Sequence, residues 1–511
     1  MPRRGPLAAE GRSRSGRGER RPGIQHSFAS SSRVEEEETM TMINRPWSIV
    51  LASLIPIVGC SSEPEGTNPL VEGPTAGPTF HKDVAPILQK RCQGCHSPGE
   101  IAPFSLTEYA DAKQVSSRIV AVTQDRTMPP WGAIETDECT PRFGWKDDSR
   151  LTDAELATLE AWHDAGAPEG DPADAPPAID ASGIHGLEGV SATIEPLKPY
   201  VTGGDEDQFR CFVMDPKLTE DTFVNGMNVI PGNSKVVHHV VVFTDPHAES
   251  DAMADADGGY ECFGSSGVQD TQVLGVWVPG GRPTEFPSNA GFLVRAGSRL
   301  VMQVHYHPAG ATAEPDATKI QLRFLPETPE YRVVFVAFGN FPSQFPNGDG
   351  LQPGPNDREG VEFFVPAGAK EHTEVMKMTL PETFMGESLV DGIRLYSAMT
   401  HMHYVGTDMK VDVERPSPQG GDPAEECVVQ TPKWDFNWQQ TYTIDAPIEE
   451  LPVLKTGDVM SLRCLYDNTM DNPFVRRALQ EENLTAPRDI VLGESSLDEM
   501  CIGLFNGFVK N

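Results

Sequence analysis

The chain has 511 residues, and its 75 acidic against 41 basic side chains give a formal net charge of −34 at pH 7. Such a charge repels phosphate backbones and argues against nucleic acid as a partner. The length exceeds what one hydrophobic core supports, so several domains are expected. The 45 prolines and 47 glycines indicate many short strands and turns rather than long helices.

Residues 1–59 are predicted to lie outside any folded domain. Residues 1–39 are rich in Arg, Gly and Ser and could form no core, so we expect the true start at Met40 or Met42. The apolar run from Trp47 to Val58 is too short to span a bilayer and is typical of a secretory signal. The letters "IVGC" resemble the lipobox of bacterial lipoproteins, in which the cysteine, here Cys60, carries the lipid. We therefore expect an exported protein that is anchored in a bacterial cell envelope, at the outer membrane or periplasmic face, through this lipid alone.

Residues 60–77 have the composition of a flexible tether, and a cysteine motif follows it. In "QKRCQGCHSP" the residues Cys92, Cys95 and His96 form C-x-x-C-H, the attachment signature of c-type haem. Two thioether bonds hold the porphyrin, and the histidine is an axial ligand of the iron. The alternatives are a redox-active C-x-x-C and a chance match. Met128 of "RTMPPW" is the predicted second axial ligand, the alternative being a packing methionine.

The stretch "RLTDAELATLEAWHDAG" predicts a helix. Thr152 and Glu155 have the spacing of a capping box at the start of the helix, and Gly166 is predicted to end it. The apolar residues along one side of this helix are Leu151, Leu156, Leu159 and Trp162. Residues 78–170 are therefore predicted to form a small all-α cytochrome c domain. The Pro-, Ala- and Asp-rich residues 171–190 are predicted to be a linker, and His185 within it is given no role.

After the linker the chain consists of short β-type runs separated by Gly, Pro and Asn, such as "KIQLRFL" and "YRVVFVAFG". This pattern predicts an all-β sandwich fold with enough chain for two domains. Three runs carry histidine pairs: His238 with His239, His305 with His307, and His401 with His403. Exposed strand histidines are an adequate explanation for any one pair, but three pairs on apolar strands favour metal binding.

The spacing of the pairs predicts how they would bind. Residues i and i+2 share a face of a strand, so H-x-H is a natural two-nitrogen chelate. Adjacent His238 and His239 point to opposite faces, so one metal could bind both only through a twist, a bulge or Nδ1 ligation. Nitrogen-rich sites suit zinc or copper. A thioether such as that of Met500 would favour Cu(I).

The runs "HHVVVF", "LVMQVHYHP", "MTHMHYVGTD" and "DEMC" resemble, in this order, the copper type II ascorbate-dependent monooxygenases, which include peptidylglycine hydroxylating and dopamine β-monooxygenases. The resemblance covers roughly residues 190–511. It implies two jelly-roll-like β-sandwich domains, at 191–328 and 329–511, with one copper each. It assigns one copper to His238, His239 and His305, and the other, where O₂ chemistry occurs, to His401, His403 and Met500. The resemblance does not make His307 a ligand, so we expect it to be exposed or to contact a copper ligand from behind.

An exported chain folds in an oxidising compartment, where cysteines can form disulfides. Six cysteines remain once Cys60 and the two cysteines of the haem motif are set aside. Six cysteines allow 15 pairings, so spacing alone does not settle them. The resemblance implies Cys464–Cys501 and Cys211–Cys262. Cys139 and Cys427 are left unassigned, and a bond between them would staple two domains together.

Substrate residues depart from the family pattern. Peptide-amidating members carry an Arg two positions before H-x-H, where this chain has Met399, and Asn and Tyr after Met-Cys, where it has Ile502 and Leu504. A carboxylate clamp is therefore missing at the expected place. We expect a monooxygenase that hydroxylates a C–H bond of a small, rather apolar organic molecule with O₂. Ascorbate, another reductant, a redox partner protein or the fused haem would supply the electrons. The alternative is a non-catalytic haem–copper electron carrier or copper-binding lipoprotein.

Overall fold

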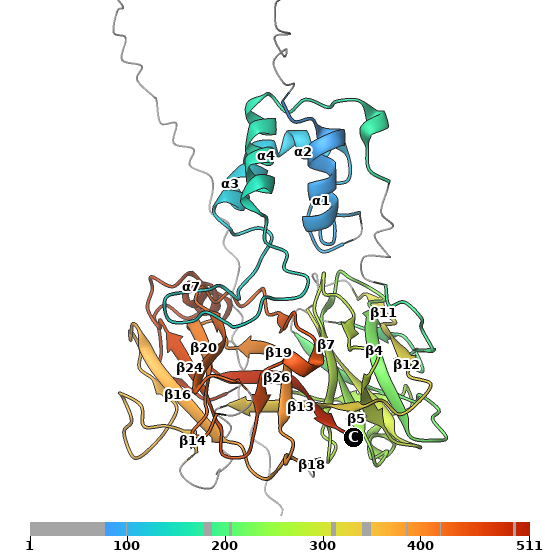
Figure 1. Ribbon diagram of the computed structural model, residues 1–511, viewed down its shortest axis with the longest axis vertical. Helices are drawn as coiled ribbons and strands as arrows, with labels where there is room; N and C mark the ends of the chain where they lie inside the picture. Colours follow the sequence, from blue (N-terminus) through green and yellow to red (C-terminus); the bar gives the residue numbers. More distant parts are fainter. Residues whose placement is uncertain are drawn as a thin grey trace, which may run out of the picture. The chain divides into compact units, whose positions relative to one another are not determined.

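A computed structural model describes residues 77–511 except 99, 178–185, 204–206, 308–312, 340–348, 385–386, 419–420 and 494–496. The signal, the tether and Cys60 lie outside the described residues, as does His185. The prediction of a mainly β chain with few helices is confirmed (Figure 1). In the described part of the chain, no helix is both long and apolar enough to cross a membrane.

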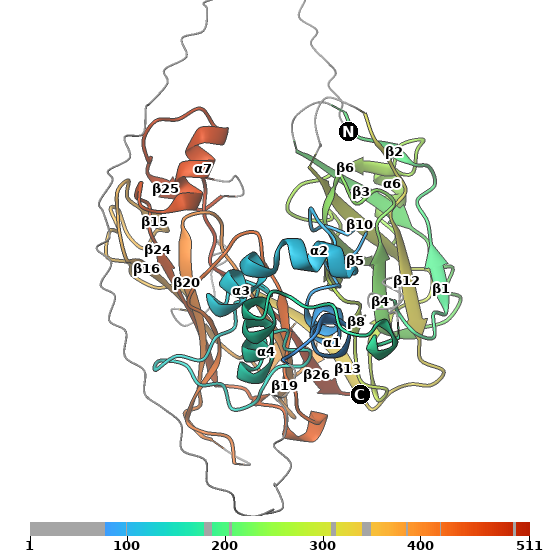
Figure 2. The same cartoon turned by 90° about the horizontal axis from the view of Figure 1, so that it is seen from above.

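The helices α1 to α4 lie together (Figure 2) and share a small core of their own. Phe80, Leu88, Leu159 and Trp162 lie at its centre and are almost fully buried. The predicted capping box is confirmed: the Glu155 amide donates to Thr152 Oγ1, and the Thr152 amide donates to the Glu155 carboxylate. The elements of this helical module are η1 (Phe80–Val84), α1 (Ala85–Arg91), α2 (Tyr109–Gln114), α3 (Ser116–Gln124), α4 (Asp153–Asp164) and η2 (Pro172–Asp174).

The strands of the first β region start after residue 190. Five of them form a sheet in the order β6-β3-β10-β5-β7. The elements of this region are β1 (Ala192–Ile194), β2 (Tyr200–Val201), β3 (Gln208–Met214), β4 (Thr222–Ile230), β5 (Val237–Asp245), α6 (Ser250–Met253), β6 (Gly259–Glu261), β7 (Val273–Trp277), β8 (Thr284–Glu285), β9 (Ala290–Val294), β10 (Arg299–Tyr306), β11 (Pro315–Asp316) and β12 (Lys319–Phe324).

The second β region has its own five-stranded sheet, in the order β14-β16-β24-β20-β21. Its elements are β13 (Tyr331–Gly339), β14 (Gly350–Leu351), β15 (Phe364–Val365), β16 (His372–Thr379), β17 (Thr383–Phe384), β18 (Glu387–Ser388), β19 (Ile393–His401), β20 (Gly406–Glu414), β21 (Glu425–Thr431), β22 (Thr441–Thr443), η4 (Ile448–Glu450), β23 (Val453–Leu454), β24 (Val459–Tyr466), α7 (Pro473–Glu481), β25 (Ile490–Val491) and β26 (Ile502–Lys510).

A ten-stranded sheet runs through both β regions, in the order β1-β12-β4-β9-β13-β26-β19-β22 with β8 and β23 beside it. The regions join where β13 pairs in parallel with β9, at Tyr331 opposite Ala290 and Arg332 opposite Gly291. Alternate residues are buried on β16 and β24, as period-2 patterning requires, whereas β4, β10 and β19 are buried on both faces. The arrangement is consistent with two β-sandwiches, and the sheet common to both was not predicted.

Three disulfides link described residues: Cys211–Cys262, Cys464–Cys501 and Cys139–Cys427. The first two are the pairs that the resemblance implies. The third joins a segment between α3 and α4 to β21, across 288 residues of sequence. We call residues 130–147 the strap. The strap falls within the residues 78–170 predicted to form the helical module, but its buried Ala133 and Trp145 pack into the core of the β regions.

Candidate metal centres

A β-bulge brings three histidines together on adjacent strands. His239 of β5 lies opposite His305 of β10, but the next residue of β10, Tyr306, lies opposite Val237. His238 is therefore the extra residue of the bulge. Without a bulge its ring would point to the face opposite that of His239. Of the arrangements that would let one metal bind both residues, the structure thus contains a bulge.

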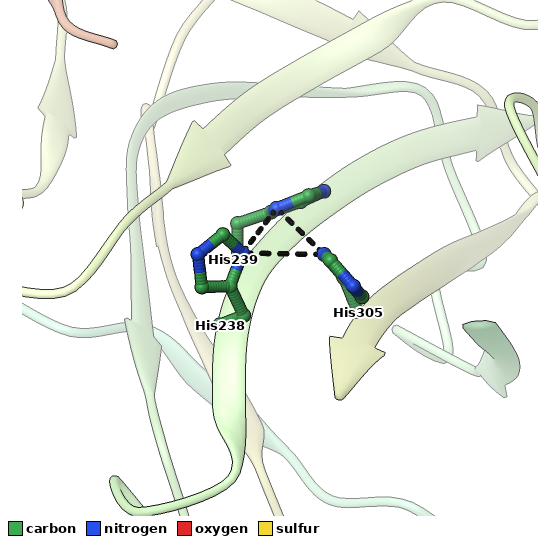
Figure 3. A group of neighbouring side chains, drawn as sticks. All are labelled: His238, His239 and His305. Carbon is green, nitrogen blue, oxygen red and sulfur yellow. Dashed lines mark hydrogen bonds between the residues drawn. The ribbon is translucent and has the colours of Figure 1, made fainter. Parts of the chain in front are cut away.

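The Nδ1 atoms of His238, His239 and His305 form a nearly equilateral triangle with sides of 3.2, 3.3 and 3.3 Å (Figure 3). The point equidistant from them lies about 1.9 Å from each atom, close to the ~2.0 Å of a metal–imidazole bond. Of the described residues, no other set of three His, Cys, Asp or Glu has all its ligand atoms within 4.8 Å. The three rings therefore fit a metal ion bound by nitrogen.

A carboxylate holds one of these rings from behind. Asp207 accepts a hydrogen bond from His305 Nε2 at 2.9 Å, which leaves His305 Nδ1 free to bind metal. The other oxygen of Asp207 accepts from His307 Nδ1 at 2.7 Å. Burial opposes the effect, but these two hydrogen bonds lower the pKa of Asp207 to about 2. His307 thus braces the carboxylate that orients His305, and its own ring is largely exposed.

Replacing Asp207 by Asn is expected to weaken metal binding at the three-histidine site by roughly 10–100-fold, because carboxylates behind ligating histidines fix ring orientation and raise basicity. Competitive copper titration of this variant measures the loss. Asp257→Asn, a change at an exposed carboxylate paired with Lys198, is the matched control. Unaltered affinity in Asp207→Asn would show that Asp207 does not support the site.

The second histidine pair lies at the end of β19. His401 is the last residue of this strand, and His403 follows it in irregular chain, so the expectation of two ligands on one regular strand face is wrong. The pair is held by hydrogen bonds instead. His401 Nδ1 donates to Gln439 Oε1 at 2.6 Å, and His403 Nδ1 donates to the Asp498 carbonyl at 3.1 Å. The lone pairs of the two Nε2 atoms are therefore available to bind a metal. The centroids of the two rings lie 5.2 Å apart.

Glu499 ties this pair to Met500. The Glu499 side chain is fully buried, and one of its oxygens accepts from the amides of His403 and Met500, both at 2.9 Å. Its other oxygen accepts from the amides of Val405 at 2.8 Å and Gly406 at 3.1 Å. One carboxylate therefore fixes the backbone of both segments that carry the predicted ligands.

Burial and neighbouring imidazoles lower the pKa values of His238, His239 and His401. Partial burial, followed by the nearby His305, lowers the pKa of His238 to about 4. Burial and the adjacent His403 lower the pKa of His401 to about 4. The pKa of His239 lies well below its ordinary value, through burial, His305 and His238, with a smaller contribution from His401. At neutral pH the rings of His238, His239 and His401 are therefore uncharged and carry free lone pairs.

The C-x-x-C-H motif follows α1. Cys92 and Cys95 are the free cysteines of the described residues. His96 Nδ1 donates to the Phe104 carbonyl at 3.1 Å, which leaves Nε2 free for a metal. Burial raises the pKa of the Cys92 thiol to about 12 and raises that of Cys95. Met128 is half-buried beyond α3, and its amide donates to the Val122 carbonyl at 3.1 Å.

Asp207, Gln439 and Glu499 were missed by the sequence analysis. Asp207 and Gln439 lie in chain outside the strands that carry their histidines, so no periodicity links them to those rings. Glu499 gave little local signal, since it is the second of two adjacent acidic residues, Asp498 and Glu499, directly before Met500. Only the fold shows that it is the buried and hydrogen-bonded one of the two.

Comparison with solved structures gives only weak likenesses. The chain is similar to the major capsid protein P2 of bacteriophage PM2 at 10% identity, over 63% of this chain and 98% of that one, with a TM-score of 0.26. It is similar to the infectious bursal disease virus VP2 subviral particle at 8% identity, over 62% of this chain and 70% of that one, with a TM-score of 0.18. Scores this low support no conclusion. Comparison with curated proteins found no match.

Family models match the chain on both β regions. Residues 199–312 match the N-terminal domain of the copper type II ascorbate-dependent monooxygenases, and residues 364–505 match the C-terminal domain. The two matches together span half of the chain and include every histidine described above except those of the helical module. The chain therefore belongs to the copper type II ascorbate-dependent monooxygenase family, whose members are oxidoreductases that use two copper ions, ascorbate and O₂ on a small organic substrate.

Proposed function

We propose that His238, His239 and His305 hold one copper and that His401, His403 and Met500 hold the other. The observation that carries this proposal is the triangle of Nδ1 atoms, whose dimensions suit a metal ion. Copper bound to imidazole and thioether supplies one-electron redox chemistry and a Cu(I) form that reacts with O₂.

The two donor sets support different roles. The thioether of Met500 favours Cu(I), so we assign O₂ activation and C–H hydroxylation to the set that contains it. The three-nitrogen set lacks such a soft donor, and we assign to it the storage of a second electron. The described residues that contact these ligands orient them: Asp207 and Gln439 each hold a ring, and Glu499 holds the backbone of His403 and Met500.

The substrate proposed is a small, rather apolar organic molecule. In the pairing of β19 with β26, Met399 lies opposite Leu504 and His401 lies opposite Ile502. Residues paired in this way project to the same face of a sheet, so three apolar side chains share the face of His401. A surface of this kind favours apolar groups, and it offers no cation for a carboxylate.

Oxygen uptake with ascorbate and a panel of small aromatic and aliphatic compounds tests the function. We expect coupled O₂ consumption with at least one neutral compound, and slower turnover of its carboxylated analogue. Uptake with glycine-extended peptides, but with none of the neutral compounds, would contradict the proposed substrate class.

We further propose that Cys92 and Cys95 attach a c-type haem with His96 as an axial ligand and Met128 as the other. The free Nε2 of His96 supports this role. The raised thiol pKa values argue against a redox-active C-x-x-C, because catalytic dithiols need a lowered pKa. Electrons for hydroxylation would come from ascorbate or another reductant, or from a redox partner through this haem.

We propose that the protein is exported and held at the cell envelope by a lipid on Cys60, which lies outside the described residues. Cys60→Ser is expected to release the protein from the membrane fraction, because no other attachment point is proposed. Fractionation followed by immunoblotting measures the release, with Ser61→Ala as the control. Persistence of the Cys60→Ser protein in membranes would contradict the lipoprotein proposal.

A further inference from the structure

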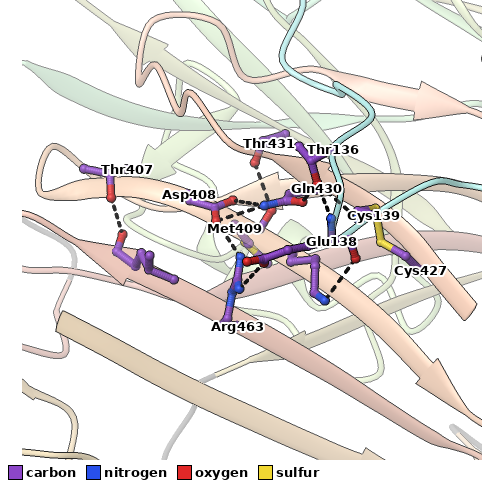
Figure 4. A network of polar contacts seen from close by, with 12 residues as sticks. Thr136, Glu138, Cys139, Thr407, Asp408, Met409, Cys427, Gln430, Thr431 and Arg463 are labelled. Atoms are coloured by element: carbon purple, nitrogen blue, oxygen red, sulfur yellow. Dashed lines mark hydrogen bonds and ion pairs between the residues drawn. A yellow bond between two sulfur atoms is a disulfide. The ribbon is translucent and has the colours of Figure 1, made fainter. Parts of the chain in front are cut away.

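Most of the strap is bound to the second β region. Cys139 is bonded to Cys427, Thr136 Oγ1 donates to Gln430 Oε1 at 2.6 Å, and Glu138 pairs with Arg463 at 2.5 Å (Figure 4). Further along the strap, Arg142 pairs with Asp422 at 2.8 Å. The Lys146 amide donates to the Thr443 carbonyl at 2.8 Å. Because the strap leaves from α3 and returns to α4, these contacts fix the helical module to the β region that contains His401.

The start of the strap lies against β22. The Gly132 amide donates to Tyr442 Oη at 3.1 Å, and the Trp131 ring meets the Tyr442 ring edge-on at 5.2 Å. A Cβ at Gly132 would lie 2.7 Å from Tyr442 Oη, so only glycine allows this close approach. Directly before these residues, the Pro130 carbonyl accepts from Gln440 Nε2 at 3.1 Å.

These contacts form a continuous connection to a predicted copper ligand. Met128 is two residues before Pro130, whose carbonyl binds the side chain of Gln440. The neighbouring Gln439 binds His401 Nδ1 at 2.6 Å. Covalent bonds and two hydrogen bonds therefore lead from the proposed axial methionine of the haem to the ring of His401.

The helical module has weaker connections to the three-histidine site. Cys95 Sγ packs against Gly280, where a Cβ would lie only 2.6 Å from the sulfur. Asp147, at the end of the strap, pairs with Arg282 at 3.0 Å, and both side chains are largely exposed. Among the described residues, no hydrogen bond joins the helical module to His238, His239 or His305.

We propose that Gln439 and Gln440 are positioning residues, which would align the haem held by Cys92, Cys95, His96 and Met128 with the copper held by His401, His403 and Met500, so that this copper would be the first to accept the haem's electron. The inference rests on the proposed haem and copper ligands. The transfer would oxidise Fe(II) to Fe(III) and reduce Cu(II) to Cu(I) by one electron, with no atom transferred. The three-histidine copper would then take its electron from a separate donor such as ascorbate.

Flash photolysis of the full-length, haem- and copper-loaded protein tests where the electron arrives. A flash-generated flavin semiquinone reduces the haem, and the haem absorbance and the Cu(II) electron paramagnetic resonance (EPR) signal then follow its reoxidation. We expect equal reoxidation rates, independent of protein concentration, in the unmodified protein and in His239→Ala. We expect no reoxidation in His401→Ala or in Met500→Ile.

Gln440→Leu tests the connection itself, because it removes the hydrogen bond to Pro130 and leaves all proposed ligands in place. We expect reoxidation to slow several-fold with both Cu(II) signals unchanged, whereas Gln480→Ala, at an exposed glutamine of α7, leaves the rate unaltered. An unchanged rate in Gln440→Leu would remove Gln440 from the route. Loss of reoxidation in His239→Ala but not in His401→Ala would overturn the inference and leave the proposed haem supply intact. A haem that stays reduced in the unmodified protein would refute that supply as well.

Discussion

Replacing Met500 by Ile is expected to abolish O₂-dependent hydroxylation and to leave copper bound at the three-histidine site. Isoleucine is apolar and of similar volume, so the Glu499 hydrogen bonds to the backbone are retained. What is lost is the thioether, the soft donor that favours Cu(I). Without it, the two imidazoles of His401 and His403 remain as the only protein donors proposed for that copper.

Coupled O₂ uptake and copper content per chain measure the two parts of this prediction. Met470→Ile is the matched control, because Met470 is 48% exposed and lies in a loop before α7. The control should retain full activity and both coppers. Near-normal turnover by Met500→Ile would remove Met500 from the copper site.

Replacing Glu499 by Gln is expected to lower copper affinity at the His401, His403 and Met500 site by roughly 10–100-fold, the usual effect of removing a group that orients metal ligands. The amide keeps the shape of the carboxylate but presents an NH₂ group to two of the four backbone amides. Each buried amide left unpaired costs about 1–3 kcal/mol, so the segments around His403 and Met500 should move apart.

Copper titration monitored by EPR separates this effect from general destabilisation. The three-histidine copper should keep its affinity and its spectrum, while the signal of the other copper changes. Glu482→Gln, at an exposed position after α7, serves as the control. Equal loss at both sites would indicate a fold defect rather than a role in positioning Met500.

Local patterns were sufficient for much of this structure. The capping box at Thr152 and Glu155 was readable because its two residues are three apart and need no tertiary partner. The strands containing the histidine pairs could be predicted because each is a short apolar run bounded by turn residues, and the run at His238 is also rich in valine. The resemblance supplied the pairs Cys211–Cys262 and Cys464–Cys501, which spacing alone left among many alternatives.

Features that depend on strand register and on long-range contacts could not be predicted from the sequence. The bulge at His238 depends on which residue of β10 faces which residue of β5, and sequence periodicity does not determine that register. The strap has the composition of an ordinary loop, and its partners around Cys427 and Tyr442 are about 300 residues away. The parallel pair of β9 with β13 spans only two residues, too few to leave a pattern.

Copper and haem content per chain tests the central claim most directly. Protein loaded with copper and purified should contain two coppers and one covalently bound haem, measured by elemental analysis and by the pyridine haemochrome spectrum. His239→Ala and His401→Ala should each retain one copper, and the haem content should be unaffected in both. A single copper in the unmodified protein, or two coppers in His239→Ala, would contradict the account.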